Sequence, residues 1–377
     1  MFSVLRTLRQ PSTLCADFSE KDVFFLTSTS VDYRKQSRSV FFVLLPVMFM
    51  AVYYYGGRAL ALCGVGASVS VLTDFVCRRL QHKETREPYD LSALNTGIIL
   101  AMLLPASAPY WLAAAGAFIA IAVVRHPFGG YSSTLFHPAN TAFAFLLICW
   151  TELATRYPLP GQQLSYANDP GVTLYTSPAA KLMTGGAERL DWLDVLMGDY
   201  VGPMGCTCML ILVLCGLYLS LRKSAHWQIM VSVIAVVAFF AIVAPRVNSS
   251  TFSSVALELI SGSMLFCLIF IASLNTSELH TSLGCWIYGL MLGGLIVLFR
   301  YLSSIEMVTP FAIIIMNTID HRCDDYGPKL ISLGRKTVLL IKNGFCFCGK
   351  SIGRGVGKIW DLISELLQKM VDGPKDK

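Results

Sequence analysis

Long apolar runs recur along most of the chain, separated by short polar segments. The runs do not alternate apolar with polar residues, as the strands of a membrane β-barrel would, so they predict helices. Each run has about 15 to 20 residues, close to the length that crosses the hydrocarbon core of a bilayer. The helices are expected near 39–56, 58–77, 92–106, 110–125, 138–152, 204–221, 226–244, 252–273, 283–299 and 305–320. The predicted fold is an all-α polytopic membrane protein of about ten transmembrane helices.

Composition supports this prediction and argues against a soluble globular protein. Of the 377 residues, 54% are hydrophobic and only 14% are charged, whereas soluble proteins carry about 25% charged residues. The first 38 residues mix cations with acids and hydroxyls and lack a short apolar core before a cleavage site. This pattern predicts no cleaved signal peptide.

Lysine and arginine in the short loops gather on one side of the predicted helices. Cytoplasmic loops of membrane proteins are enriched in these cations, so we expect both termini to be cytoplasmic and the loop 153–203 to be external. The cations on this side are Lys35, Arg38, Arg78, Arg79, Lys83, Arg86, Arg125, Arg222, Lys223 and Arg322. The predicted location is the inner (cytoplasmic) membrane of the cell.

The predicted helices divide into two groups of five. An odd number of helices per half forces the second half to enter the membrane upside down, which is the inverted-repeat plan of many transporters. Thr96-Gly97 in the third helix matches Ser261-Gly262 in the eighth, and Phe143-Ala144 in the fifth matches Phe311-Ala312 in the tenth. The predicted segments are a cytoplasmic N-terminal segment, a first repeat, an external loop, a second repeat and a basic cytoplasmic tail, at 1–38, 39–152, 153–203, 204–322 and 323–377.

The tail differs in kind from the rest of the chain. Several lysines and arginines precede apolar residues that repeat with helical spacing between Ile359 and Val371. Such a helix lies on an anionic leaflet or packs against a partner protein, and the sequence leaves both interpretations open.

The twelve cysteines do not form a metal-binding pattern. No CxxC spacing occurs, and most cysteines stand alone inside apolar runs. Examples are Cys63, Cys149, Cys215, Cys267 and Cys285. We interpret them as buried small hydrophobic residues and expect no metal site, and no iron–sulfur cluster ligated by this chain alone.

The densest polar stretch at a helix end is 125–141. Pro127, Gly129, Gly130 and Pro138 forbid a continuous helix there, so the freed backbone groups need protein, water, an ion or a cofactor if the stretch lies at membrane depth. The alternative is a plain loop at the bilayer surface. His126 and His137 alone do not define a metal site.

Four segments resemble motifs of the RnfD/NqrB family. Ser92–Pro105, which contains Thr96 and Gly97, resembles the family's "Thr-Gly-x-Leu-Leu-Ala-x-x-Leu-Pro" segment, and Phe128–Ala139 resembles its "Phe-Gly-Gly … Phe-Asn-Pro-Ala" loop. In the second half, Leu259–Leu265 and Phe311–Asn317 resemble its "Gly-Gly-x-Met-Leu" and "Phe-Ala-Ile-Leu-Leu-Met-Asn" helices. The matches follow the family order across about residues 30–330.

The resemblance implies a membrane component of an Rnf-type complex that couples electron transfer between ferredoxin and NAD to movement of Na⁺ or H⁺. Its partners would be other membrane and peripheral subunits and the bilayer, with no nucleic acid, and the chain would not be catalytic alone. One alternative is a channel or secondary transporter with the same inverted-repeat fold and no redox role. Another is a structural anchor for a partner enzyme.

The resemblance also implies a flavin, which family members usually carry as FMN linked through its phosphate to a threonine in a "Ser-Gly-Ala-Thr" loop. The corresponding residues here run from Thr176 and Ser177 to Lys181, and Ala180 takes the acceptor position. Alanine has no hydroxyl, so FMN would be held non-covalently, held by Ser177 or Thr176, or absent. The cofactor-binding residues that the resemblance implies are Thr176, Ser177, Lys181, Thr96, Gly97, Gly129 and Gly130.

Two further departures from the family pattern indicate that part of its chemistry has changed. His137 stands where the family has asparagine, and Leu274-Asn275 replaces its Asp-Pro.

Overall fold

A computed structural model describes most of the chain as helices. The described residues are 20–81, 91–127, 136–162, 164–166, 173–175, 196–245, 251–260, 263–274, 282–302 and 307–319. Within these ranges the only non-helical pairing is an isolated antiparallel bridge between Tyr157 and Tyr175. The all-helical class is confirmed for this part of the chain.

The described residues of the N-terminal part contain six α-helices. They are α1 (Glu20–Tyr55), α2 (Gly57–Leu80), α3 (Ser92–Leu103), α4 (Tyr110–Phe118), α5 (Pro138–Cys149) and the short α6 (Thr151–Thr155). After α4 the chain continues as a π-helical segment, Ile119–Arg125. These helices lie within a few residues of the predicted ones, apart from the start of α1.

The C-terminal part begins with a 3₁₀ turn at Met204–Cys206. Its α-helices are α9 (Met209–Leu221), α10 (Trp227–Val243), α11 (Thr251–Ile260), α12 (Met264–Cys267), α13 (Ser282–Leu302) and α14 (Thr309–Asn317). A π-helical segment, Leu268–Ala272, continues α12.

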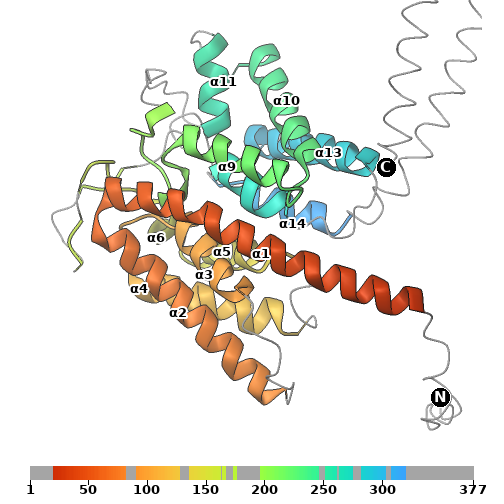
Figure 1. The fold of residues 1–377 in the computed structure, drawn as a ribbon. Coiled ribbons are helices and arrows are strands. Elements are labelled where there is room, and N and C mark those ends of the chain that lie inside the picture. The colour runs from red at the N-terminus through yellow and green to blue at the C-terminus, as the bar shows by residue number, and fades with distance from the viewer. Residues whose placement is uncertain are drawn as a thin grey trace, which may run out of the picture.

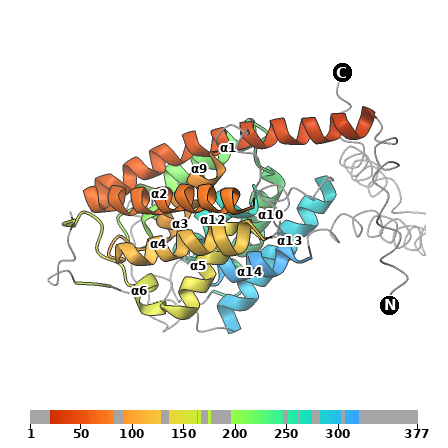
Figure 2. The ribbon, with the colours of Figure 1, turned by 90° about the horizontal axis from the view of Figure 1, so that it is seen from below.

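Helix α1 is longer than the sequence predicts. It begins at Glu20 instead of residue 39 and has 36 residues, which gives a length of about 54 Å against a hydrocarbon core of about 30 Å. Hydropathy finds only the apolar part, Lys35–Tyr55, because a helix can continue through polar sequence outside lipid. In Figures 1 and 2 the N-terminal end of α1 extends past the other helices.

The predicted eighth helix, 252–273, is not continuous in the structure. It is divided into α11 and α12, and Ser263 before α12 has a φ of 54°, in the left-handed region. An L-residue in this region ends a right-handed helix. The hydropathy pattern did not show this break because both pieces are apolar.

Among the described residues, three helices are long and apolar enough to cross a membrane, at Lys35–Tyr55, Gly57–Leu80 and Gly284–Leu302, and several shorter apolar helices accompany them. Large apolar side chains such as Phe49, Leu72 and Leu217 are exposed on the outside of the helices. An exposed apolar surface of this kind is typical of a chain surrounded by lipid.

The prediction of buried cysteines is confirmed for Cys63, Cys215, Cys267 and Cys285 and is wrong for Cys149, which is exposed. Cys149 is the last residue of α5. Its side chain faces outward there, beside the exposed Ile148 and Trp150.

The helices form two groups with α1 running along their boundary. Figure 1 shows α2 to α5 on one side of α1 and α9 to α14 on the other. Contacts between the groups join α1 to α9 and α5 to α14. In the first group α2 packs on both α3 and α4.

Several predicted features lie outside the described residues. They are residues 1–19, the glycine-containing part of the break at 128–135, most of the external loop from 176 to 195, and the tail from 320 onwards. The amphipathic helix of the tail and the pair Cys346/Cys348 are among them.

Candidate functional site

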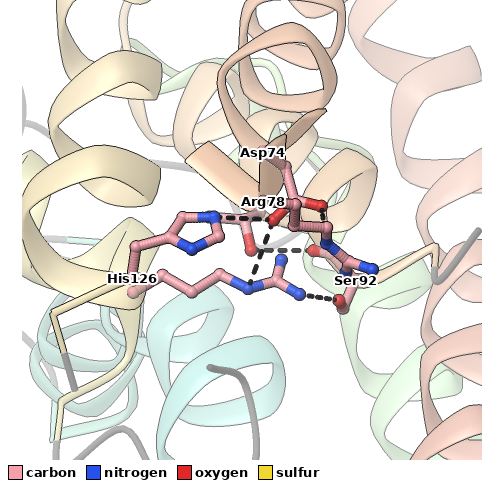
Figure 3. Close-up of polar contacts among 6 residues, drawn as sticks. Asp74, Arg78, Ser92 and His126 are labelled. Atoms are coloured by element: carbon pink, nitrogen blue, oxygen red, sulfur yellow. Dashed lines mark hydrogen bonds and ion pairs between the residues drawn. The ribbon is translucent and has the colours of Figure 1, made fainter. Parts of the chain in front are cut away.

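The polar cluster that precedes the glycine–proline break is built around the carboxylate of Asp74 on α2. Nε of Arg78 lies 2.8 Å from Oδ2 of Asp74, and Nε2 of His126 lies 3.0 Å from Oδ1. Nε of Arg125 is 3.9 Å from the same Oδ1. Figure 3 shows these side chains converging from the ends of α2 and of the π-helical segment.

The same cluster reaches the start of α3. Nη2 of Arg125 donates a hydrogen bond of 2.8 Å to Oγ of Ser92 (Figure 3), the first residue of α3. Arg125 and Ser92 are both buried. One carboxylate therefore joins three segments at the point where the chain enters the break.

Three side chains surround the carboxylate of Asp74, namely the guanidinium groups of Arg78 and Arg125 and the imidazole of His126. Burial lowers the pKa of His126 below its usual value of 6.5, although Asp74 raises it in part. A neutral imidazole donates its Nε2 proton to the carboxylate of Asp74, so the cluster is an ion-pair and hydrogen-bond network that joins helix ends.

Thr96 and Gly97, two of the predicted flavin-binding residues, lie buried on α3 where it crosses α2. Oγ1 of Thr96 donates to the carbonyl oxygen of Ser92 at 2.8 Å. A Cβ on Gly97 would lie 2.3 Å from the carbonyl oxygen of Gly66, and a Cβ on Gly66 would lie 2.7 Å from that of Gly97. The two glycines thus allow a close backbone contact between α2 and α3.

The residue that follows the break leads into a contact between the two groups of helices. His137 is buried and precedes α5. In the first turn of α5, Nδ2 of Asn140 donates to the carbonyl oxygen of Pro310 on α14 at 2.9 Å. The chain that follows the break, from His137 to Asn140, therefore lies at the boundary between the groups.

A second buried ion pair lies in the C-terminal group. Nη1 of Arg300, near the end of α13, is 2.8 Å from Oε2 of Glu258 on α11 and also contacts the Glu258 carbonyl oxygen at 2.6 Å. Both side chains are buried. A buried pair of this kind carries a strong desolvation cost that its hydrogen bonds must offset.

The remaining predicted site residues lie outside the described part of the chain. They are Thr176, Ser177, Lys181, Gly129 and Gly130, together with Ala180 at the family's acceptor position. Among the described residues, no group of three or more His, Cys, Asp or Glu side chains could hold a metal ion.

Sequence reasoning missed Asp74 and Glu258 as members of buried networks. Each is the single acid of its helix, and an ionisable residue at membrane depth is costly unless it is paired. That signal was available in the sequence. The sequence could not show which helices carry the partner arginines Arg125 and Arg300, because these lie far from the acids along the chain.

Comparison with known proteins gives a family match. The sequence model of the NQR2, RnfD, RnfE family matches residues 25–329. The chain is 30% identical over 286 residues to the D subunit of the Na⁺-translocating ferredoxin:NAD⁺ oxidoreductase complex of Acetobacterium woodii, with 74% of this chain and 84% of the relative covered. It is 28% identical over 323 residues to the D subunit of the ion-translocating oxidoreductase complex of Haemophilus ducreyi, covering 77% and 92%. The D subunit of the proton-translocating ferredoxin:NAD⁺ oxidoreductase complex of Clostridium ljungdahlii is 27% identical over 296 residues, covering 76% and 88%.

Proposed function

Because the chain belongs to the NQR2, RnfD, RnfE family, we propose that it is the D-type membrane component of an Rnf-type complex. The complex couples electron transfer between ferredoxin and NAD to translocation of Na⁺ or H⁺, and the chain acts with other membrane and peripheral subunits. The observation that carries this proposal is the extent of the match, which runs through both groups of helices. The named relatives include one Na⁺-translocating and one proton-translocating complex, so the proposal includes either ion.

Purification from the native membrane tests this function. A tagged chain solubilised in mild detergent is expected to co-elute with the other subunits of an Rnf-type complex and with ferredoxin:NAD oxidoreductase activity. A chain that elutes alone, while the remaining subunits assemble and work without it, would refute the assignment.

The alternative is a channel or secondary transporter without a redox role. The observation that favours it is Ala180, which lacks the hydroxyl used for flavin attachment in the family. Reconstitution of the chain alone into liposomes separates the two functions, because only the alternative predicts solute flux without partner subunits.

Two five-helix units related by an inverted repeat are the architecture that we propose for this function. The helix contacts support it, since α2 packs on α3 and α4 just as α10 packs on α11 and α13. Likewise α5 packs on α3 and α4, and α14 packs on α12 and α13. The fourth helix of each unit ends near a buried arginine, Arg125 or Arg300, that pairs with a carboxylate.

The orientation follows from the cation bias of the loops, with both termini and the loop 78–91 cytoplasmic and residues 153–203 external. Single cysteines placed at Thr85 and Leu190 in a background without other reactive cysteines test it. An impermeant thiol reagent applied to intact cells, given access to the external face of the inner membrane, is expected to label position 190 and not position 85. The reverse labelling would refute the orientation.

A flavin does not fit covalent attachment at position 180. A phosphoester needs a side-chain oxygen, and Ala180 has none. Ser177 and Thr176 carry hydroxyls nearby, and Lys181 offers a cation for a phosphate held without a covalent bond. When bound, a flavin supplies one-electron and two-electron transfer, and the role of this chain is to hold its phosphate.

Denaturing gel electrophoresis under ultraviolet light distinguishes these modes, since only a covalently attached flavin stays fluorescent on the protein band. We expect no fluorescence on the band of this chain. A fluorescent band that disappears in Ser177→Ala would show that the acceptor has moved to Ser177.

A further inference from the structure

The N-terminal ends of α5 and α14 meet inside the protein. Asn140 of α5 donates through Nδ2 to the carbonyl oxygen of Pro310, the second residue of α14. The residues around both helix starts are buried, including His137, Ala139 and Asn140 on one side and Val308 and Thr309 on the other. Both helices exceed eight residues, so each presents a complete N-terminal turn to this junction.

Polar atoms at this junction have no hydrogen-bond partner among the described residues. They include Oδ1 of Asn140 and Oγ1 of Thr309, in side chains that are 0% and 1% exposed. Because Nδ2 of Asn140 contacts Pro310, the amide to which Oδ1 belongs is held beside the first turn of α14. Thr309 directly precedes Pro310, so both orphan oxygens belong to the same junction. Buried polar groups of this kind usually bind ordered water.

The electrostatics of two helix starts narrow the choice of ligand. The first N–H groups of a helix lack acceptors within it, and each N-terminus carries about half a positive charge. Neither α5 nor α14 contains an acidic residue. The field of the two helix starts by itself disfavours a cation. An anion could accept from the N–H groups but could not donate to Oδ1 of Asn140, whereas water can do both.

We propose that the N-terminal ends of α5 and α14 enclose an ordered-water site, and that their positive ends make this site a barrier to cations between the two groups of helices. The barrier rests on the proposed inverted arrangement, in which the two helices enter from opposite faces of the membrane. The water site does not depend on that arrangement or on the redox function. A consequence is that the translocated ion crosses the complex by a route other than the α5–α14 junction.

Cryo-electron microscopy of the intact complex tests the water site in the wild-type protein. Maps are compared after purification in Na⁺ and in Tl⁺, an electron-dense monovalent cation. We expect density within hydrogen-bonding distance of Oδ1 of Asn140 and Oγ1 of Thr309 that is equal in the two maps. Stronger density with Tl⁺ would identify a cation site and overturn the proposal, as would an empty junction in a map that shows other buried waters.

Ion leak through the reconstituted complex tests the barrier. Asn140→Asp places a carboxylate of the same shape between the two helix starts, and the passive Na⁺ or H⁺ leak without electron donor is expected to rise at least about tenfold, as a barrier lower by ~1.4 kcal/mol would give. The matched control is Asn317→Asp, the same change at the other end of α14, where Oδ1 accepts from the hydroxyl of Tyr288.

The control is expected to leave the leak unchanged. An unchanged leak in Asn140→Asp, in a complex that elutes with all its subunits, would overturn the barrier. An equal rise in both variants would also overturn it, because the leak would then follow from any buried carboxylate. If Asn140→Asp does not assemble, the comparison of Na⁺ and Tl⁺ maps still decides the water site.

Discussion

The role of Gly97 can be tested through the close contact that it makes between α2 and α3. Gly97→Ala adds a Cβ that would lie 2.3 Å from the carbonyl oxygen of Gly66 and 2.6 Å from Oγ of Ser70. The first neighbour is backbone and cannot rotate away. To reach van der Waals distance at about 3.5 Å, the helices would have to move apart by roughly 1 Å.

The change in the free energy of unfolding caused by Gly97→Ala is the sum of two opposing effects. Overpacking of a buried contact costs about 1–3 kcal/mol, and replacing glycine by alanine in a helix returns about 0.5–1 kcal/mol. We expect a net destabilisation of about 1–2 kcal/mol, which corresponds to a fall of about 1–3 °C in the melting temperature of a detergent-solubilised chain of 377 residues. The measurement is thermal unfolding followed by tryptophan fluorescence.

The matched control is Gly64→Ala on α2, because a Cβ on Gly64 would meet no atom within 4 Å. Its melting temperature is expected to stay equal or rise slightly. The result that would refute this reasoning is a Gly97→Ala variant as stable as Gly64→Ala. If that variant had also lost bound flavin, Gly97 would serve the cofactor, as the family resemblance implies, and not the helix contact.

Two further predictions concern the buried charges. Glu258→Gln removes the carboxylate that pairs with the guanidinium of Arg300 and is expected to lower the free energy of unfolding by about 3–5 kcal/mol. The control, Glu152→Gln at an exposed position, is expected to leave the melting temperature unchanged. Equal effects of the two variants would show that the ion pair does not stabilise the protein. Because the pKa of His126 is lowered in the folded protein, the unfolded chain binds a proton first, so stability should fall as the pH drops below about 6.5. His126→Gln should reduce the slope of the melting temperature between pH 7.5 and 5.5 without abolishing it, because burial also lowers the pKa of His137, to about 4. An unchanged slope would contradict this assignment.

The positions of the helices could be predicted from the sequence more accurately than their ends and breaks. The apolar cores of α2, α4 and α10 could be read directly, because lipid demands long apolar runs. The start of α1 at Glu20 could not be predicted, because a helix outside lipid has no hydropathy signal. The break before α12 coincides with the positive φ of Ser263, a backbone conformation that a hydropathy pattern does not report.

The site was harder to predict than the fold because its residues meet across long distances in the chain. The stretch 125–141 was singled out from its prolines and glycines, but its contacts with Asp74 and Pro310 come from helices that no local pattern places beside it. Family resemblance supplied Thr96 and Gly97 as cofactor residues, a role that stays a prediction. In the structure the Thr96 hydroxyl donates to a carbonyl oxygen of its own helix, and Gly97 lies in the α2–α3 contact.

The two buried arginines show what the proposed duplication keeps and what it changes. Arg125 ends the π-helical segment after α4, and Arg300 lies in the last turn of α13, so they occupy corresponding places in the two proposed units. Their acidic partners do not correspond, because Asp74 comes from the second helix of its unit and Glu258 from the third. A buried guanidinium needs a nearby carboxylate, and several neighbouring helices can supply one. The shared requirement is therefore a carboxylate within reach of each buried guanidinium, and the helix that supplies this acid can differ between the units.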